Sequence, residues 1–193
     1  MKKIIFILTA SLWLVAAQAQ SATTYTYTLS GLLSGNHNET AFENKAFTMT
    51  ISAPDTSIGP PWFGGNVYVV GSYNSSEASD ITLTVADVGT AIFSAPNTGF
   101  FNNLTNSVAG FNTSADLCSF YAAEFATYQL GDLAPTPVVV SYYPNIFDGT
   151  DTWSSLVYSE AVFQATSVPE SSTLAILGIG ALALAARRRK QAA

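Results

Sequence analysis

Basic residues are scarce in the long middle of this chain. Between residues 20 and 168 of the 193-residue sequence the only base is Lys45, which stands against twelve Asp and Glu residues, so this stretch carries a net charge of −11. Proteins bind nucleic acid through clustered Lys and Arg side chains that displace counterions from the phosphates. The scarcity of bases therefore excludes a nucleic-acid partner.

Cysteine occurs once, as Cys118. A single cysteine cannot form an intramolecular disulfide, so an exported protein with this sequence must be held together by core packing. Free cysteine is among the most buried residue types. We predict that Cys118 is a small buried residue without a chemical role.

Histidine also occurs once, which limits the catalytic and metal sites that the chain can build. His37 and Cys118 cannot together complete the usual four-ligand set of a zinc site. His37 lies in "SGNHNET", a predicted hairpin loop, and although Ser34 and Glu39 flank it there is no G-x-S-x-G nucleophile elbow. We therefore expect no catalytic residue and no cofactor.

Long apolar runs are confined to the two ends of the chain, and the first belongs to residues 1–19, "MKKIIFILTASLWLVAAQA". Two lysines precede an apolar core that is followed by small residues, which is the order of a secretory signal peptide. We predict cleavage after Ala19. An uncleaved membrane anchor is the alternative, although the apolar core is short for a span.

The second apolar segment covers residues 171–186 and contains no charge. As a helix it would extend about 24 Å, somewhat less than a hydrocarbon core of about 30 Å. Adjacent bases stay on the cytoplasmic side of a membrane segment. We predict a C-terminal transmembrane helix with the body of the protein outside the inner membrane. The basic tail consists of Arg187, Arg188, Arg189 and Lys190.

The order of these features at residues 168–193 resembles the PEP-CTERM sorting signal of Gram-negative bacteria. That signal has Val-Pro-Glu-Pro-Ser, a short apolar helix and a terminal arginine cluster. Val168, Pro169 and Glu170 match the pattern, whereas Ser171 occupies the place of the second proline. The resemblance covers about 25 residues, and the signal peptide at the other end of the chain agrees with it.

The resemblance implies export and processing. Proteins with this tail are handled by an exosortase, an integral membrane enzyme with a cysteine nucleophile, which cuts near the Pro-Glu motif and releases or transfers the body toward the cell surface. Pro169 favours an extended Val168 and so a cleavable strand. The expected partners are the secretion machinery, the exosortase and the inner membrane. A plain C-terminal anchor that is never cut is the alternative.

Residues 20–167 are predicted to form one secreted β domain, because apolar and threonine residues alternate with a period of two. Tyr25, Tyr27 and Leu29 are expected on one face of the first strand. Many short strands separated by turn signals favour an antiparallel β-sandwich or jelly roll. Further strands are predicted at residues 47–51, 66–73, 81–85, 90–95, 120–130, 138–142, 152–158 and 162–166.

Three residues of the body are weak candidates for a ligand site. Trp62 lies between a proline pair and a glycine pair in "GPPWFGG", where its ring could stack on a sugar or plug the end of the core. Asp148 and Asp151 in "FDGTD" offer the oxygen ligands that calcium takes, but without EF-hand spacing, so a solvated turn is the plainer interpretation.

The sequence thus predicts an exported, non-catalytic protein of the cell surface or extracellular matrix with a structural or adhesive role. A carbohydrate- or calcium-binding module of the envelope is the alternative, with extracellular polysaccharide as its partner. A hydrolase ranks third.

Overall fold

Two ranges at the ends of the chain lie outside the part of the protein that the structure describes. The computed structural model describes residues 23–55, 58, 66–71, 80–94, 98–113, 116–141, 145–147 and 151–169. The predicted signal peptide, the predicted transmembrane helix, Glu170 and the basic tail fall outside these ranges, as do Trp62 and Asp148. None of the helical structure in the described ranges is long and apolar enough to cross a membrane.

The described residues form twelve strands and one short 3₁₀ helix. They are β1 (Thr23–His37), β2 (Thr40–Pro54), β3 (Val67–Gly71), β4 (Ile81–Val85), β5 (Gly89–Phe93), β6 (Gly99–Asn103), β7 (Val108–Asn112), β8 (Asp116–Tyr121), η2 (Ala123–Ala126), β9 (Leu133–Pro137), β10 (Val139–Val140), β11 (Asn145–Phe147) and β12 (Thr152–Pro169).

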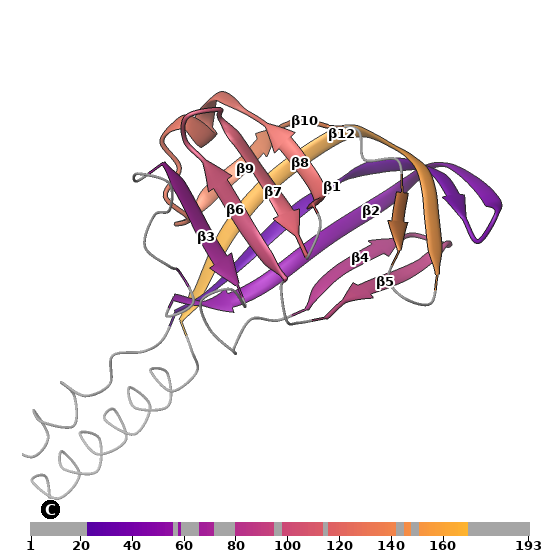
Figure 1. Cartoon of the computed structure of the whole chain (residues 1–193), viewed down its shortest axis with the longest axis horizontal. Helices are drawn as coiled ribbons and strands as arrows, with labels where there is room; N and C mark the ends of the chain where they lie inside the picture. The colour runs from indigo at the N-terminus through magenta and orange to yellow at the C-terminus, as the bar shows by residue number, and fades with distance from the viewer. Residues whose placement is uncertain are drawn as a thin grey trace, which may run out of the picture. The chain divides into compact units, whose positions relative to one another are not determined.

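Antiparallel pairing arranges these strands into two sheets (Figure 1). The long sheet has the order β11-β12-β1-β2-β4-β5, with β9 also paired to β12, and the short sheet has the order β10-β8-β7-β6-β3. The first and last strands are therefore neighbours. The predicted all-β, antiparallel class is confirmed.

The two sheets pack face to face through aromatic side chains. Phe163 of β12 stacks on Phe100 of β6, with ring centroids 5.1 Å apart and an interplanar angle of 3°. Phe163 also contacts Phe120 of β8 at 5.2 Å and Phe125 of η2 at 5.5 Å. All four rings are completely buried. Because such rings each remove about 150–250 Å² from water, this cluster is a main source of stability for the sandwich-like body.

Period-two alternation predicted the inward faces of three strands correctly. Tyr27 and Leu29 of β1 are buried, and Tyr25 packs against the core. The same is true of the inward residues of the two other strands, which are Phe47, Met49, Ile51, Ile81, Leu83 and Val85. Each of these strands has one apolar face toward the core and a threonine-rich face on the other side, as antiparallel sheets commonly do.

The two strands predicted at residues 152–158 and 162–166 are in fact one 18-residue strand, β12. Ser155 and Glu160 have positive φ angles of 54° and 51°, and the inward alternation slips by one residue at each of them. Such bulges bend and twist a strand without ending it. The sequence pattern breaks at these two points, which is why it indicated a strand end.

The strand predicted over residues 120–130 is wrong beyond Tyr121, where β8 ends and a 3₁₀ turn follows. The buried side chain of Asn102 on β6 donates from Nδ2 to the carbonyl oxygens of Phe125 (3.0 Å) and Tyr128 (2.6 Å). A side chain therefore satisfies two carbonyl groups of this segment, where a strand would use a neighbouring backbone.

Four strands were not predicted, namely β6, β7, β9 and β11. β6 and β7 form a hairpin, but their asparagine and glycine residues are untypical of strands. β9 contains Pro135 and Pro137, and it pairs only with β12, so its other side needs no amide donors.

Candidate functional site

The tip of the β1–β2 hairpin is a two-residue turn with an unusual composition. Asn38 and Glu39 have φ angles of 47° and 68°, as in the type I′ turns that join tightly paired strands. Asparagine and glycine are favoured in such turns, because other residues adopt positive φ at an energetic cost. Glu39 thus has a backbone conformation that disfavours glutamate.

Hydrogen bonds brace this turn against the start of β12. The Asn38 amide donates to the carbonyl oxygen of Thr152 (2.9 Å), and the Thr152 amide donates to Asn38 Oδ1 (3.0 Å). Asn38 Nδ2 donates to Asp151 Oδ1 at 2.7 Å. The other carboxylate oxygen of Asp151 lies 3.4 Å from His37 Nε2. Four residues from the two ends of the body sequence therefore form one connected network.

Aromatic side chains pack against the inner side of the same tip. The His37 ring stacks on Trp153 with centroids 4.2 Å apart, and Phe42 approaches Trp153 edge-on at 6.2 Å. Trp153 is completely buried. Gly89 at the start of β5 lies so close that a Cβ atom there would be 3.2 Å from His37 Cε1. The turn is consequently supported by closely packed side chains of β1, β2 and β12.

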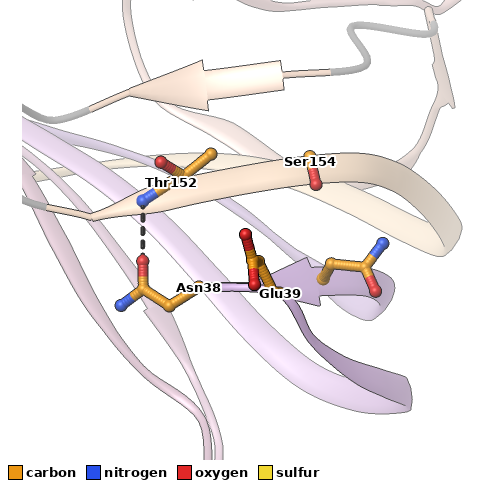
Figure 2. Close-up of a pocket in the computed structure, with 5 residues that line it drawn as sticks. Asn38, Glu39, Thr152 and Ser154 are labelled. Carbon is orange, nitrogen blue, oxygen red and sulfur yellow. Dashed lines mark hydrogen bonds between the residues drawn. The ribbon is translucent and has the colours of Figure 1, made fainter.

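The outer side of the tip carries a pocket of about 500 Å³ lined by polar residues. Successive side chains of a strand alternate between its two faces. Since His37 and Trp153 point inward, the residues directly before and after each of them face outward. Figure 2 shows Asn38 and Glu39 on the hairpin directed toward the strand that carries Thr152 and Ser154. The five lining residues are Asn36, Asn38, Glu39, Thr152 and Ser154.

The charge at this tip is predominantly negative. Glu39 and Asp151 contribute two carboxylates. Lys45 is the only base among the described residues, and its Nζ atom lies 3.2 Å from Asp87 Oδ2 in a second hollow next to the hairpin. Amide, hydroxyl and carboxylate groups around one pocket can bind a neutral polyhydroxylated ligand, whereas an anionic ligand would be repelled.

The structure separates the residues that the sequence singled out. Asp151 lies at the tip, bonded to Asn38 and beside His37. Its predicted companion, Asp148, and Trp62 lie outside the described residues. In the described ranges no three His, Cys, Asp or Glu side chains come close enough to hold a metal ion.

The neighbours of His37 are also separated. Ser34 Oγ accepts a hydrogen bond from the Asn44 amide at 2.9 Å, while His37 pairs with Asp151. Sequence reasoning missed the pocket residues of β1 and β12. The period-two alternation around His37 and Trp153 is the signal that could have placed these pocket residues on one face.

The sorting motif begins inside the folded body. Val168 is 58% exposed near the end of β12, and Pro169 is the last residue of that strand. A family model described as a PEP-CTERM protein-sorting motif matches residues 167–190. No curated protein and no solved structure matches the chain.

These findings define the class of protein, which has an all-β body and a C-terminal sorting signal. The chain carries a PEP-CTERM protein-sorting motif, which implies an exported protein that is sorted via the membrane with an exosortase as its processing partner.

Proposed function

We propose that the protein is a non-catalytic component of the cell surface or extracellular matrix with a structural or adhesive role. The observation that carries this proposal is the sorting motif at residues 167–190, which begins on the last strand of the β body. A signal peptide at residues 1–19 would start export, and a helix of residues 171–186 would hold the exported domain, residues 20–167, at the inner membrane as an intermediate. Cleavage near Pro169 then delivers the domain to the outside.

The charge and packing of the body support this role. A net charge of −11 between residues 20 and 168 keeps such a domain soluble at high local concentration. The continuous aromatic core between the sheets stabilises it without a disulfide. Both properties suit a protein with a structural role outside the cell.

The test is the fate of the full-length protein in cells that have the sorting enzyme. We expect the wild type to reach the surface or the medium without residues 171–193, as measured by fractionation and mass spectrometry. Exchanging Pro169 and Glu170 for alanine should leave the full chain in the inner membrane, as should deletion of the sorting enzyme. Glu160→Gln, which changes an acid outside the motif, is the control. Intact wild-type protein in the cytosol would contradict the proposal.

A second candidate function, binding of a neutral saccharide, is favoured by the pocket at the hairpin tip. Its volume of about 500 Å³ lies in the usual range for small-ligand sites, about 300–1,000 Å³. The braced turn would keep the lining groups in place, which reduces the entropy lost on binding. In this function the tip is the adhesive end. Calcium binding by Asp148 and stacking of a sugar on Trp62 are separate contacts that the sequence suggests.

Affinity electrophoresis separates this candidate from a purely structural role. Migration of the protein should be retarded in gels that contain dextran, and not in gels that contain the acidic polysaccharide alginate. The double variant Asn36→Ala and Ser154→Ala should lose the retardation, because it removes pocket groups while Asn38 still braces the turn. Thr105→Ala, an exposed change in the β6–β7 turn, is the matched control. Equal mobility of all three proteins in dextran would exclude the candidate.

A further inference from the structure

The sorting motif and the last strand of the body overlap by three residues. The matched motif starts at residue 167, whereas β12 continues to Pro169. The last core residue before the motif is Ala165, which is 2% exposed and pairs with Leu133 of β9. One residue, Thr166, therefore separates the packed core from the segment that the sorting enzyme recognises. The body has no flexible spacer at this point.

The end of β12 is also held by a side-chain hydrogen bond. Ser167 Oγ donates to Asp132 Oδ2 at 3.0 Å, and Asp132 directly precedes β9. Ser167 belongs to the matched motif, and Asp132 belongs to the body. This bond lies at the surface, near the end of β12.

The first strand leaves the body at the same place. Gly31 of β1 lies beside Ser159 and Glu160 of β12, and Asn38 lies beside Thr152, so β1 and β12 run in opposite directions. The start of β1 and the end of β12 consequently share one end of the long sheet. The predicted signal-peptide cut after Ala19 would leave only residues 20–22 before β1.

A membrane-embedded enzyme cannot act on a peptide segment that remains part of a folded sheet. A chain enters such an active site in an extended form that is free of its neighbouring strands, because the enzyme must contact both sides of it. With one residue between the core and the motif, little chain is free to carry the motif from the folded domain into the active site. Some of β12 must therefore detach first.

We infer that release of Ser167, Val168 and Pro169 from the sheet controls cutting by the sorting enzyme, and that the Ser167–Asp132 hydrogen bond is a latch on this release. The inference rests on the proposed function, since it concerns the same processing step. Strand ends open at small free-energy cost where few buried contacts hold them, and Val168 is largely exposed. The body thus sets the rate of its own sorting without global unfolding.

The latch is tested by pulse-chase labelling of the full chain in cells that contain the sorting enzyme. Asp132→Ala removes the acceptor of the Ser167 hydroxyl and should speed cutting about two- to fivefold, the factor that corresponds to one surface hydrogen bond. Asp132→Asn is the matched control, because its amide oxygen still accepts the bond while the charge is lost. It should be cut at close to the wild-type rate.

The missing spacer is tested by an insertion. Six residues, Gly-Ser-Gly-Ser-Gly-Ser, placed between Thr166 and Ser167 should accelerate cutting more than Asp132→Ala does. The same insertion between Thr105 and Asn106, in the exposed β6–β7 turn, should leave the rate unchanged. Thermal melting of each full-length variant in detergent should show that the body is folded, so that a faster cut reports release of β12.

The outcomes separate this inference from the proposed function. If the wild type is never cut, the proposed processing fails and the inference fails with it. If the wild type is cut and the 166/167 insertion leaves the rate unchanged or lowers it, the latch and spacer inference alone is wrong. If Asp132→Asn is as fast as Asp132→Ala, the hydrogen bond is not the latch.

Discussion

At the scale of single residues, Asn102 shows how one buried polar side chain determines a local fold. It is completely buried on β6, and its Nδ2 atom holds the carbonyl groups of Phe125 and Tyr128. The Tyr27 hydroxyl donates to the Leu130 carbonyl at 3.0 Å nearby. These bonds keep residues 123–130 against the sheets as a turn. The asparagine at position 102, a residue type that is untypical of strands, therefore has a structural reason in this hairpin.

We predict that Asn102→Ala lowers the free energy of unfolding by about 2–4 kcal/mol. The change leaves two buried carbonyl groups without donors, and each unsatisfied group costs about 1–3 kcal/mol. Urea unfolding followed by tryptophan fluorescence measures the difference. Asn106→Ala, at an exposed position of the β6–β7 turn, should change the free energy of unfolding by less than about 0.5 kcal/mol. Equal midpoints for both variants would show that the Asn102 bonds are unimportant.

At the scale of elements, the pairing of β1 with β12 depends on a close backbone approach. Gly31 has a φ of 156°, and a Cβ atom there would lie 2.8 Å from the carbonyl oxygen of Ser159 and 2.9 Å from that of Glu160. Glu160 is also a bulge position with a positive φ. The bulge brings the backbone of β12 against β1, and only glycine leaves room for it.

We expect Gly31→Ala to destabilise the body by about 1–3 kcal/mol, because the added methyl group must push two backbones apart or distort the bulge. Gly131→Ala is the matched control, since a Cβ atom at that position has no neighbour within 4 Å. Differential scanning calorimetry of both variants tests the expectation. A melting temperature of Gly31→Ala equal to that of the control would rule out the close approach.

At the scale of the whole molecule, four buried ionisable groups link stability to alkaline pH. Burial raises the pKa of the Tyr27, Tyr128 and Tyr158 hydroxyls above the ordinary 10.0, and it raises the pKa of the Cys118 thiol above 9.0. Nearby tyrosines and Asp132 add a smaller repulsion for Tyr27 and Tyr128. Cys118 is completely buried, as the sequence predicted.

The sign of the effect follows from proton release. Above pH 9–10 the unfolded chain loses these protons while the folded protein keeps them, so the stability present below that range is lost as pH rises. The slope should approach about 1.4 kcal/mol per pH unit for each group. Urea midpoints at pH 8, 9.5 and 10.5 measure it, with tyrosinate absorbance as a second signal. Stability that stays constant up to pH 11 would contradict this prediction, and Tyr158→Phe should make the decline shallower.

Much of the fold could be predicted from the sequence, and little of the candidate site could. Period two in the Tyr25–Leu29 region identified the inward face of β1, because burial of one sheet face imposes that period directly. The bulges at Ser155 and Glu160 interrupt the same signal, so the length of β12 was not predictable. Asp151 was recognised as a polar loop residue, but its bonds to Asn38 and proximity to His37 were not foreseen.

The sequence by itself determined the all-β class, the burial of Cys118, the scarcity of bases between residues 20 and 168 and the sorting motif, since each depends on neighbouring residues or on composition. Only the tertiary structure decided that Asn38 meets Asp151, 113 positions away, and that β12 runs into the motif without a spacer. Such contacts depend on strand order, register and bulges, which arise when the two sheets pack and are not encoded in any short stretch of the chain.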